Sequence, residues 1–141
     1  MSQQKNRAHS VMAKFSFHKD VSMPDGKSAL VYGSNKKGTH DVGWALIAAT
    51  KFGARHGIAE GFIGTSYGIP VKGFNMEPLT LDVIKPSIEK FIAFAASRPE
   101  RQFHITRIGV TPAGLSDSQI APLFRGAPAN CSFAEEWKSY L

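Results

Sequence analysis

The chain of 141 residues has a single cysteine, no long apolar run and only 20% charged residues. One thiol, Cys131, excludes an intramolecular disulfide and argues against a zinc site built from cysteines. No stretch approaches the ~20 consecutive apolar residues that cross a bilayer. The polar first ten residues lack the apolar core of a secretion signal. We therefore expect a cytoplasmic protein that makes no membrane contact.

The share of hydrophobic residues, 43%, is that of an ordinary globular protein, and the length fits one domain. We expect this domain over residues 28–141, preceded by a basic N-terminal arm over residues 1–27. The arm ends in a turn signal at residues 23–26, and its stretch 11–17 predicts at most an edge strand. Ten phenylalanines in so short a chain favour some uncovered apolar surface, and therefore self-association.

The net charge of +6 lies in the first half of the chain. Residues 1–72 hold ten Lys/Arg and four Asp/Glu, whereas residues 73–141 hold seven of each. Such an excess is typical of a solvated basic face or of a protein with an anionic ligand. Nucleic acid is the less favoured ligand, because the basic residues are scattered rather than gathered in a stripe interleaved with aromatics. A small phosphorylated molecule fits better.

Short apolar runs alternate with helical spacing along the chain. Strands are predicted at 28–32, 65–70 and 103–108, where apolar runs end in turn residues. Helices are predicted at 44–52, from about Pro86 to 97, and from the N-cap Ser116 to about Phe124. This order predicts an α/β domain with a mainly parallel sheet flanked by helices in three layers. The tail, with Phe133 and Trp137, is expected to pack back on the domain.

Two glycine-bearing loops follow the first and third predicted strands, at residues 33–43 and 109–116. Ligands of parallel sheets bind outside the carboxyl ends of the strands, so both loops are expected at the binding edge. Glycines let backbone N–H groups approach phosphate oxygens, and a helix N-terminus adds positive potential. The alternative is a loop that is glycine-rich merely in order to turn. The predicted ligand-binding residues are Gly33, Ser34, Asn35, Lys36, Gly38, Thr39, Gly43, Gly109, Val110, Thr111, Ala113 and Gly114.

Candidates for catalysis are fewer. Asn35, His40 and Asp41 lie in the first loop, where a carboxylate or imidazole can act as a general base. Thr39 or Asp41 is alternatively a cap of the helix that follows. The chain has no metal-ligand spacing, and Ser34 is not in a nucleophile elbow. We therefore expect no metal and no cofactor.

The loops resemble those of macro domains. Residues 28–35, SALVYGSN, resemble that family's D-A-I-V-N-A-A-N segment, and residues 38–53 resemble its glycine-rich loop running into a helix. Residues 106–114, TRIGVTPAG, look like its second phosphate loop. The chain is also similar to a small set of bacterial and bacteriophage proteins that share the G-S-N, S-Y-x-I-P and T-R-I-G segments. The resemblance covers roughly residues 28–126 through short motifs.

This resemblance implies an α/β fold that binds ADP-ribose or a related nucleotide, and some members of the family hydrolyse ADP-ribose linkages. It places Asn35 near the distal ribose. Ser28 stands where the family's adenine-binding Asp would be, and Tyr32 replaces its first Asn, which leaves the base open. The alternative is a doubly wound fold that binds a nucleotide through a G-S loop after its first strand, which would place the ligand at the same loop.

The sequence therefore supports three hypotheses. The first is a reader or sponge of an ADP-ribose-like nucleotide signal, which in a phage-encoded protein would act against host defence in the host cytoplasm. The second is a hydrolase of ADP-ribose linkages or phosphoesters. The third is a structural or nucleic-acid-interacting protein that uses the basic arm.

Overall fold

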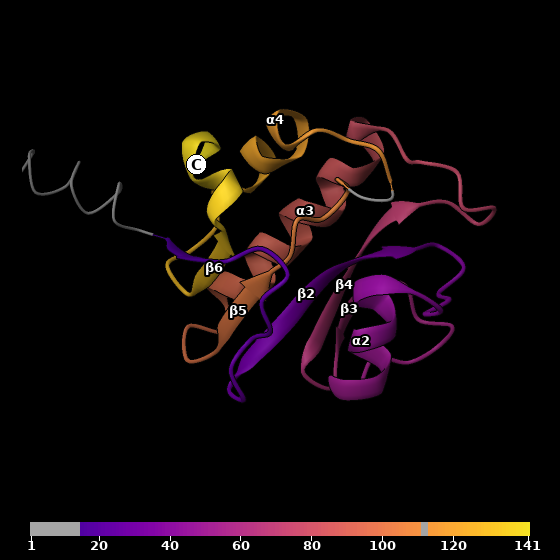
Figure 1. Cartoon of the computed structure of the whole chain (residues 1–141), viewed down its shortest axis with the longest axis horizontal. Coiled ribbons are helices and arrows are strands. Elements are labelled where there is room, and N and C mark those ends of the chain that lie inside the picture. Colours follow the sequence, from indigo (N-terminus) through magenta and orange to yellow (C-terminus); the bar gives the residue numbers. More distant parts are fainter. Residues whose placement is uncertain (1–14, 111–112) are drawn as a thin grey trace, which may run out of the picture.

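The computed structural model describes residues 15–110 and 113–141, and its framework is a six-stranded sheet with the order β1-β6-β5-β2-β4-β3. All neighbouring strands are parallel except β3 and β4. The strands are β1 (Ser16–His18), β2 (Ser28–Asn35), β3 (Gly61–Ile63), β4 (Ser66–Lys72), β5 (Gln102–Ile105) and β6 (Cys131–Ala134). The predicted α/β class with a mainly parallel sheet is confirmed (Figure 1).

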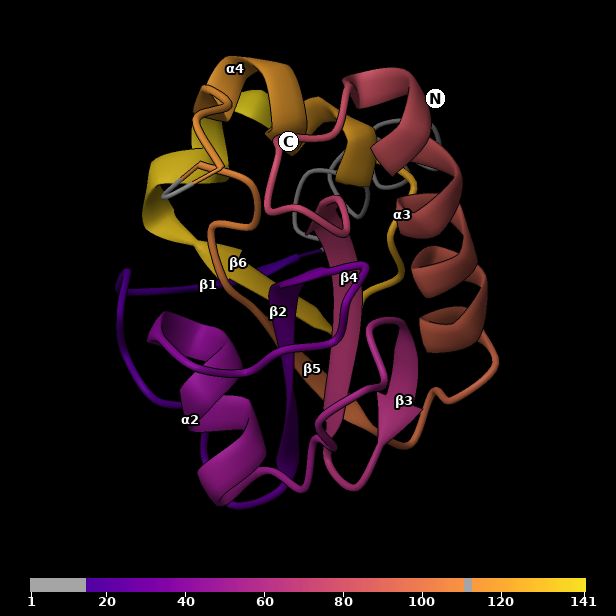
Figure 2. The same cartoon turned by 90° about the vertical axis from the view of Figure 1, so that its right-hand side faces the viewer.

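Helices cover both faces of the sheet, which makes three layers. α2 (Gly43–Lys51) lies on one face and α3 (Leu81–Ala96) on the other (Figure 2). α4 (Asp117–Ile120) continues into the 3-10 turn η1 (Ala121–Phe124), and a second 3-10 segment, η2 (Glu135–Tyr140), ends the chain. No helix of the described residues is both long and apolar enough to span a membrane.

The side chains of β2 alternate between two cores. Ala29 and Val31 belong to the large core under α3, whereas Leu30 and Tyr32 belong to a smaller core under α2. A strand that is buried on both faces has apolar residues at consecutive positions, and this run in the sequence is what predicts β2. Gly33 to Asn35 prolong this strand, so the predicted end at residue 32 is wrong by three residues. Asn35 pairs with Lys72 of β4.

α3 begins five residues earlier than predicted, at Leu81, and therefore contains Pro86. Proline inside a helix removes the hydrogen bond to the carbonyl four residues earlier. Pro86 is exposed, so water can solvate that carbonyl. The buried residues Ile84, Ile88 and Phe91 lie on one stripe of the helix, and their burial outweighs the cost of the proline.

Both ends of the chain add strands to the sheet. The N-terminal arm supplies the edge strand β1, as expected. The strand covers residues 16–18, whereas the prediction was 11–17, and residues 11–14 lie outside the described residues. The tail forms β6, which the sequence did not reveal, and the buried Cys131 is the first residue of this strand. Phe133 and Trp137 are fully buried, as predicted. The glycine-rich stretch 53–64 also contains an unpredicted strand, β3.

Candidate functional site

A hollow of about 190 Å³ lies at the carboxyl ends of β2, β4 and β5. After β2 the chain crosses one face of the sheet as α2 and adds β4 on one side of β2. It then crosses the other face as α3 and adds β5 on the other side of β2, and the hollow lies at this reversal. Such reversals are where open α/β sheets bind ligands. The lining residues are Gly33, Ser34, Asn35, Thr39, Asp41, Val42, Gly43, Trp44, Ala45, Val71, Lys72, Met76, Thr106, Arg107, Ile108, Gly109 and Ala113.

The N-terminus of α2 forms one wall of this hollow. The N–H groups of Gly43, Trp44 and Ala45 donate no hydrogen bond to another described residue, because the carbonyls that would accept them precede the helix. Gly43 has a φ of 61°, and a Cβ at this position would meet nothing within 4 Å. The helix therefore presents three unpaired donors to an open space.

The loop after β5 forms the opposite wall. Gly109 has a φ of 82°, and its N–H likewise donates to no other described residue. A Cβ on Gly33 would lie 3.8 Å from the Gly109 nitrogen and 3.1 Å from Val71 Cγ2. The bare Cα of Gly33 thus allows the β5 loop and β4 to approach β2 closely. Ala113 also lines the hollow, while Thr111 lies outside the described residues.

The first predicted loop is held together by its own polar side chains. The Asn35 amide donates to Thr39 O at 3.1 Å and to Thr39 Oγ1 at 2.9 Å, and its Oδ1 accepts the Thr39 N–H at 3.2 Å. Ser34 Oγ donates to the carbonyl of Ala59. The Asn35 bonds fix the loop itself, and the Ser34 bond ties the end of β2 to the segment that contains Ala59.

Gly38 and His40 lie away from the hollow. A Cβ on Gly38 would come within 2.5 Å of the Gly57 carbonyl carbon, so Gly38 is needed for the contact between two loops. His40 is buried, and its Nε2 is hydrogen bonded to Tyr32 Oη at 3.0 Å. Burial lowers the pKa of His40 and raises the pKa of Tyr32 to about 12. This pair is neutral near pH 7 and lies in the core under α2.

The structure corrects the expected helix caps. Val42 is the N-cap of α2, in extended conformation and without a side-chain hydrogen bond, so neither Thr39 nor Asp41 caps the helix. Asp41 is exposed and instead lines the hollow. The predicted N-cap Ser116 of α4 is confirmed: its N–H donates to Gln119 Oε1 at 2.9 Å.

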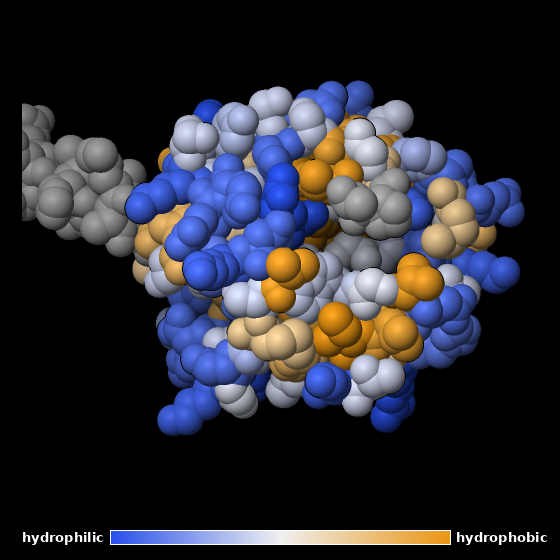
Figure 3. Space-filling view, in the orientation of Figure 1, coloured by the Kyte–Doolittle hydropathy of each residue, from blue (hydrophilic) through white to orange (hydrophobic). Residues whose placement is uncertain are grey.

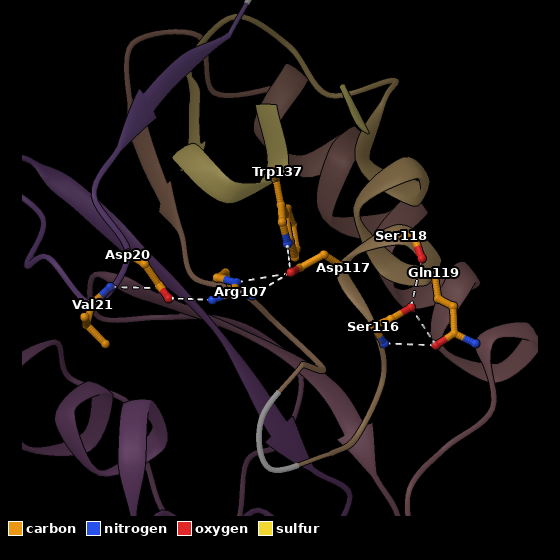
Figure 4. A network of polar contacts seen from close by, with 8 residues as sticks. All are labelled: Asp20, Val21, Arg107, Ser116, Asp117, Ser118, Gln119 and Trp137. Atoms are coloured by element: carbon orange, nitrogen blue, oxygen red, sulfur yellow. Dashed lines mark hydrogen bonds and ion pairs between the residues drawn. The ribbon is translucent and has the colours of Figure 1, made fainter. Parts of the chain in front are cut away.

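Arg107 organises the edge of the site (Figure 4). Its guanidinium donates to Asp117 at 3.1 and 2.5 Å and to Asp20 at 2.8 Å. Trp137 Nε1 donates to the same Asp117 carboxylate at 2.6 Å. These bonds raise the pKa of Arg107 and lower that of Asp117. The network joins the segment after β1, the loop after β5, the start of α4 and the tail.

A second hollow of about 370 Å³ adjoins the first. The two share Gly43, Trp44 and Arg107 in their walls. The remaining lining of the second hollow comes from the segment after β1, from α2 and from the loop after β5, and is mostly apolar: Asp20, Val21, Met23, Ile47 and Val110. Apolar side chains also gather over α2 on the face shown in Figure 3.

Most predicted binding residues converge on this place, and several do not. Gly33, Ser34, Asn35, Thr39, Gly43, Gly109 and Ala113 line the first hollow, and Val110 lines the second. Lys36, Gly38 and Gly114 line neither. Sequence reasoning missed Lys72, Met76, Arg107 and Val21, for which no local motif gives a signal.

Within residues 15–110 and 113–141, no group of three His, Cys, Asp or Glu side chains is placed to hold a metal ion. Comparison of the chain with protein-family models, with curated proteins and with solved structures found no match.

Proposed function

We propose that the protein binds an ADP-ribose-like nucleotide, with the diphosphate at the N-terminus of α2. The observation that carries this proposal is the convergence of backbone N–H groups that donate to no other described residue, from Gly43, Trp44 and Ala45 on one wall and Gly109 on the other. Oriented N–H groups and the positive end of a helix dipole together favour phosphate oxygens. Two such walls match the two phosphates of a diphosphate.

The charges around the hollow add to this attraction. Lys72 extends from the end of β4 into the wall, and no ion pair joins it to another described residue. Arg107 also reaches the hollow, but Asp20 and Asp117 offset its charge. Arg107 therefore positions the walls, while Lys72 and the helix N-terminus supply the positive potential.

The second hollow suits the base of the nucleotide. Ligand sites for molecules of this size occupy about 300–1,000 Å³, which the first hollow of about 190 Å³ does not reach by itself. The second hollow, of about 370 Å³, continues it past Trp44 and is mostly apolar. A flat base fits such a slot, with the Asp20 carboxylate at its edge as an acceptor for an amino group. Asp20 would thus supply the carboxylate that macro domains have at the position of Ser28.

The resemblance of the loops to those of macro domains is consistent with this ligand, and we propose membership of that family on the same grounds. Among the residues that the structure describes, no complete set of catalytic groups gathers in the hollow, which favours a reader or sponge of a nucleotide signal. In a phage-encoded protein this activity would serve to evade host defence.

Thermal unfolding with a nucleotide panel tests the proposal: ADP-ribose, cyclic ADP-ribose, NAD, ADP, AMP and cyclic dinucleotides. A ligand at 100 times its Kd adds about 2.7 kcal/mol, enough to raise Tm by several degrees. Gly43→Ala should abolish this rise, because the added methyl enters the open space at the helix N-terminus. Gly57→Ala is the matched control, since Gly57 also has positive φ and open space around it but lies outside both hollows. No rise with any diphosphate, or equal affinity of Gly43→Ala and Gly57→Ala, would contradict the proposal.

Hydrolysis is the second candidate, favoured by the exposed Asp41 carboxylate in the wall of the hollow. A carboxylate beside a bound diphosphate can position or deprotonate an attacking water. Chromatography of the incubated nucleotide separates the two functions. Product that disappears with Asp41→Asn indicates a hydrolase, whereas unchanged ligand indicates a binding protein.

A further inference from the structure

Two residues other than glycine have a positive φ among those the structure describes. They are Val21, with a φ of 54°, and Met76, with a φ of 64°. This left-handed region brings Cβ close to the backbone carbonyl, so any residue except glycine is disfavoured there, and a β-branched one most of all. Residues in such conformations gather at ligand clamps and active sites, where the surrounding structure holds them.

Both residues are also exposed. Val21 is 76% exposed and Met76 45% exposed, so neither gains much free energy from burial. Each lines one hollow of the site, Met76 the first and Val21 the second. Met76 follows β4. Val21 shares the wall of the second hollow with Arg107, which follows β5, and β4 and β5 flank β2 on opposite sides. The two disfavoured residues therefore stand at opposite ends of the cleft.

The turn that carries Met76 is well fixed. The Gly73 N–H donates to Glu77 O at 2.8 Å, the Met76 N–H donates to Gly73 O at 3.1 Å, and Glu77 Oε1 accepts the Asn75 N–H at 3.0 Å. The same turn exposes Phe74, at 64%. Of these two exposed apolar side chains, Met76 lines the first hollow and Phe74 lines neither. A fixed turn that holds a large exposed apolar side chain in the wall of a cleft offers a contact for a ligand.

We propose that Met76 binds a ring at the far end of the ligand, beyond the diphosphate. This inference rests on the proposed function and narrows its ligand class. The ligand then carries a ring at each end of its diphosphate, as a dinucleotide does, rather than ending in a bare ribose. The polarisable thioether of methionine is well suited to the face or edge of an aromatic ring.

Calorimetric Kd values for ADP-ribose, NAD and diadenosine diphosphate test this inference, with the unfolding midpoint in urea as a second readout. Wild type should bind at least one of the two-ring ligands fivefold or more tightly than ADP-ribose. Met76→Gly should lose that preference and should keep or raise the midpoint, because glycine accepts positive φ. Val83→Ser is the matched control, since Val83 is equally exposed, at 45%, and lies on α3 outside both hollows.

The outcomes separate the two proposals. ADP-ribose binding by wild type without a preference for either two-ring ligand overturns this inference alone. So does a Met76→Gly variant that keeps the preference, or one whose midpoint falls, because Met76 would then serve the fold. Binding of none of the three ligands by wild type overturns the proposed function, and this inference with it.

Discussion

Acidification should destabilise the protein through a pair of stacked histidines. His18 of β1 and His104 of β5 lie with ring centroids 3.6 Å apart and 16° from parallel. His18 Nδ1 is hydrogen bonded to Ser132 Oγ at 2.7 Å, and His104 Nε2 donates to Ser22 O at 3.0 Å. The pair thus holds β1 and the segment after it on the sheet.

The direction of the effect follows from the pKa values. Burial, and then the neighbouring His104 ring, lower the pKa of His18 to about 4, while a backbone hydrogen bond with Ile105 and then the charge of Asp20 oppose this. Burial also lowers the pKa of His104. The unfolded chain takes up a proton near pH 6.5, whereas the folded chain does so only near pH 4. Stability is therefore complete above pH 6.5 and falls as the pH drops from 6.5 towards 4.

The magnitude is moderate. A pKa of about 4 against an ordinary value of 6.5 corresponds to at most about 3 kcal/mol. Because His18 is only half-buried, solvent screening reduces this to roughly 1 to 2 kcal/mol. About 1 kcal/mol of it should be lost between pH 7.5 and pH 5, where the unfolded chain is already protonated.

Urea unfolding at pH 7.5, 6 and 5 measures this loss. His18→Phe keeps a ring in the stack but cannot take up a proton, so its stability should fall less than that of wild type over this range. His56→Gln, at an exposed position, controls for the removal of a histidine elsewhere. If His18→Phe and wild type lose stability in parallel, the stacked pair does not control the pH dependence and the reasoning is refuted.

Two further predictions concern stability. Gly38→Ala should cost roughly 2 to 4 kcal/mol in urea unfolding, because its Cβ would lie 2.5 Å from the Gly57 backbone at a φ of 77°. Gly57→Ala, at a φ of 91° with open space around it, should cost about 1 kcal/mol, and equal costs would contradict the contact. Asn130→Ala should cost roughly 1 to 3 kcal/mol, since the Asn130 amide donates to the carbonyls of Ala95, Arg98 and Arg101 at 2.9–3.0 Å. Asn130→Asp should cost more, because it turns acceptors towards these carbonyls, and an unfolding midpoint equal to wild type would rule out the role.

The elements that the sequence predicted correctly carry a strong local pattern. β2 is apolar on both faces, and α3 has a buried stripe that recurs at helical spacing. β3 and β6 have three and four residues, too few for a pattern to stand out from the glycines and turns around them. The start of α3 was misplaced because local rules weigh Pro86 heavily, whereas tertiary packing of the stripe decides the outcome.

The glycines of the predicted loops have two different roles, which local sequence does not distinguish. Gly43 and Gly109 were predictable, because a glycine after a strand at the carboxyl edge of a sheet is informative by itself. Gly38 looks similar in sequence but packs against Gly57, since a loop glycine can serve either a ligand or a neighbouring backbone. Only the three-dimensional position of the open space distinguishes the two.

The residues that were missed reach the site from distant parts of the chain. Met76 belongs to a turn after β4, and Val21 to the segment after β1, which the sequence alone marks only as part of a basic arm. β1 pairs with β6, which comes from the other end of the chain, and this pairing brings the segment after β1 near the loop after β5. There Arg107 binds Asp20 and holds the segment at the site. Strand order therefore decides which side chains meet the ligand, and strand order is a property of the whole sheet. The ends of the cleft, where ligand specificity is determined, are for this reason the part of the site that local motifs reveal least.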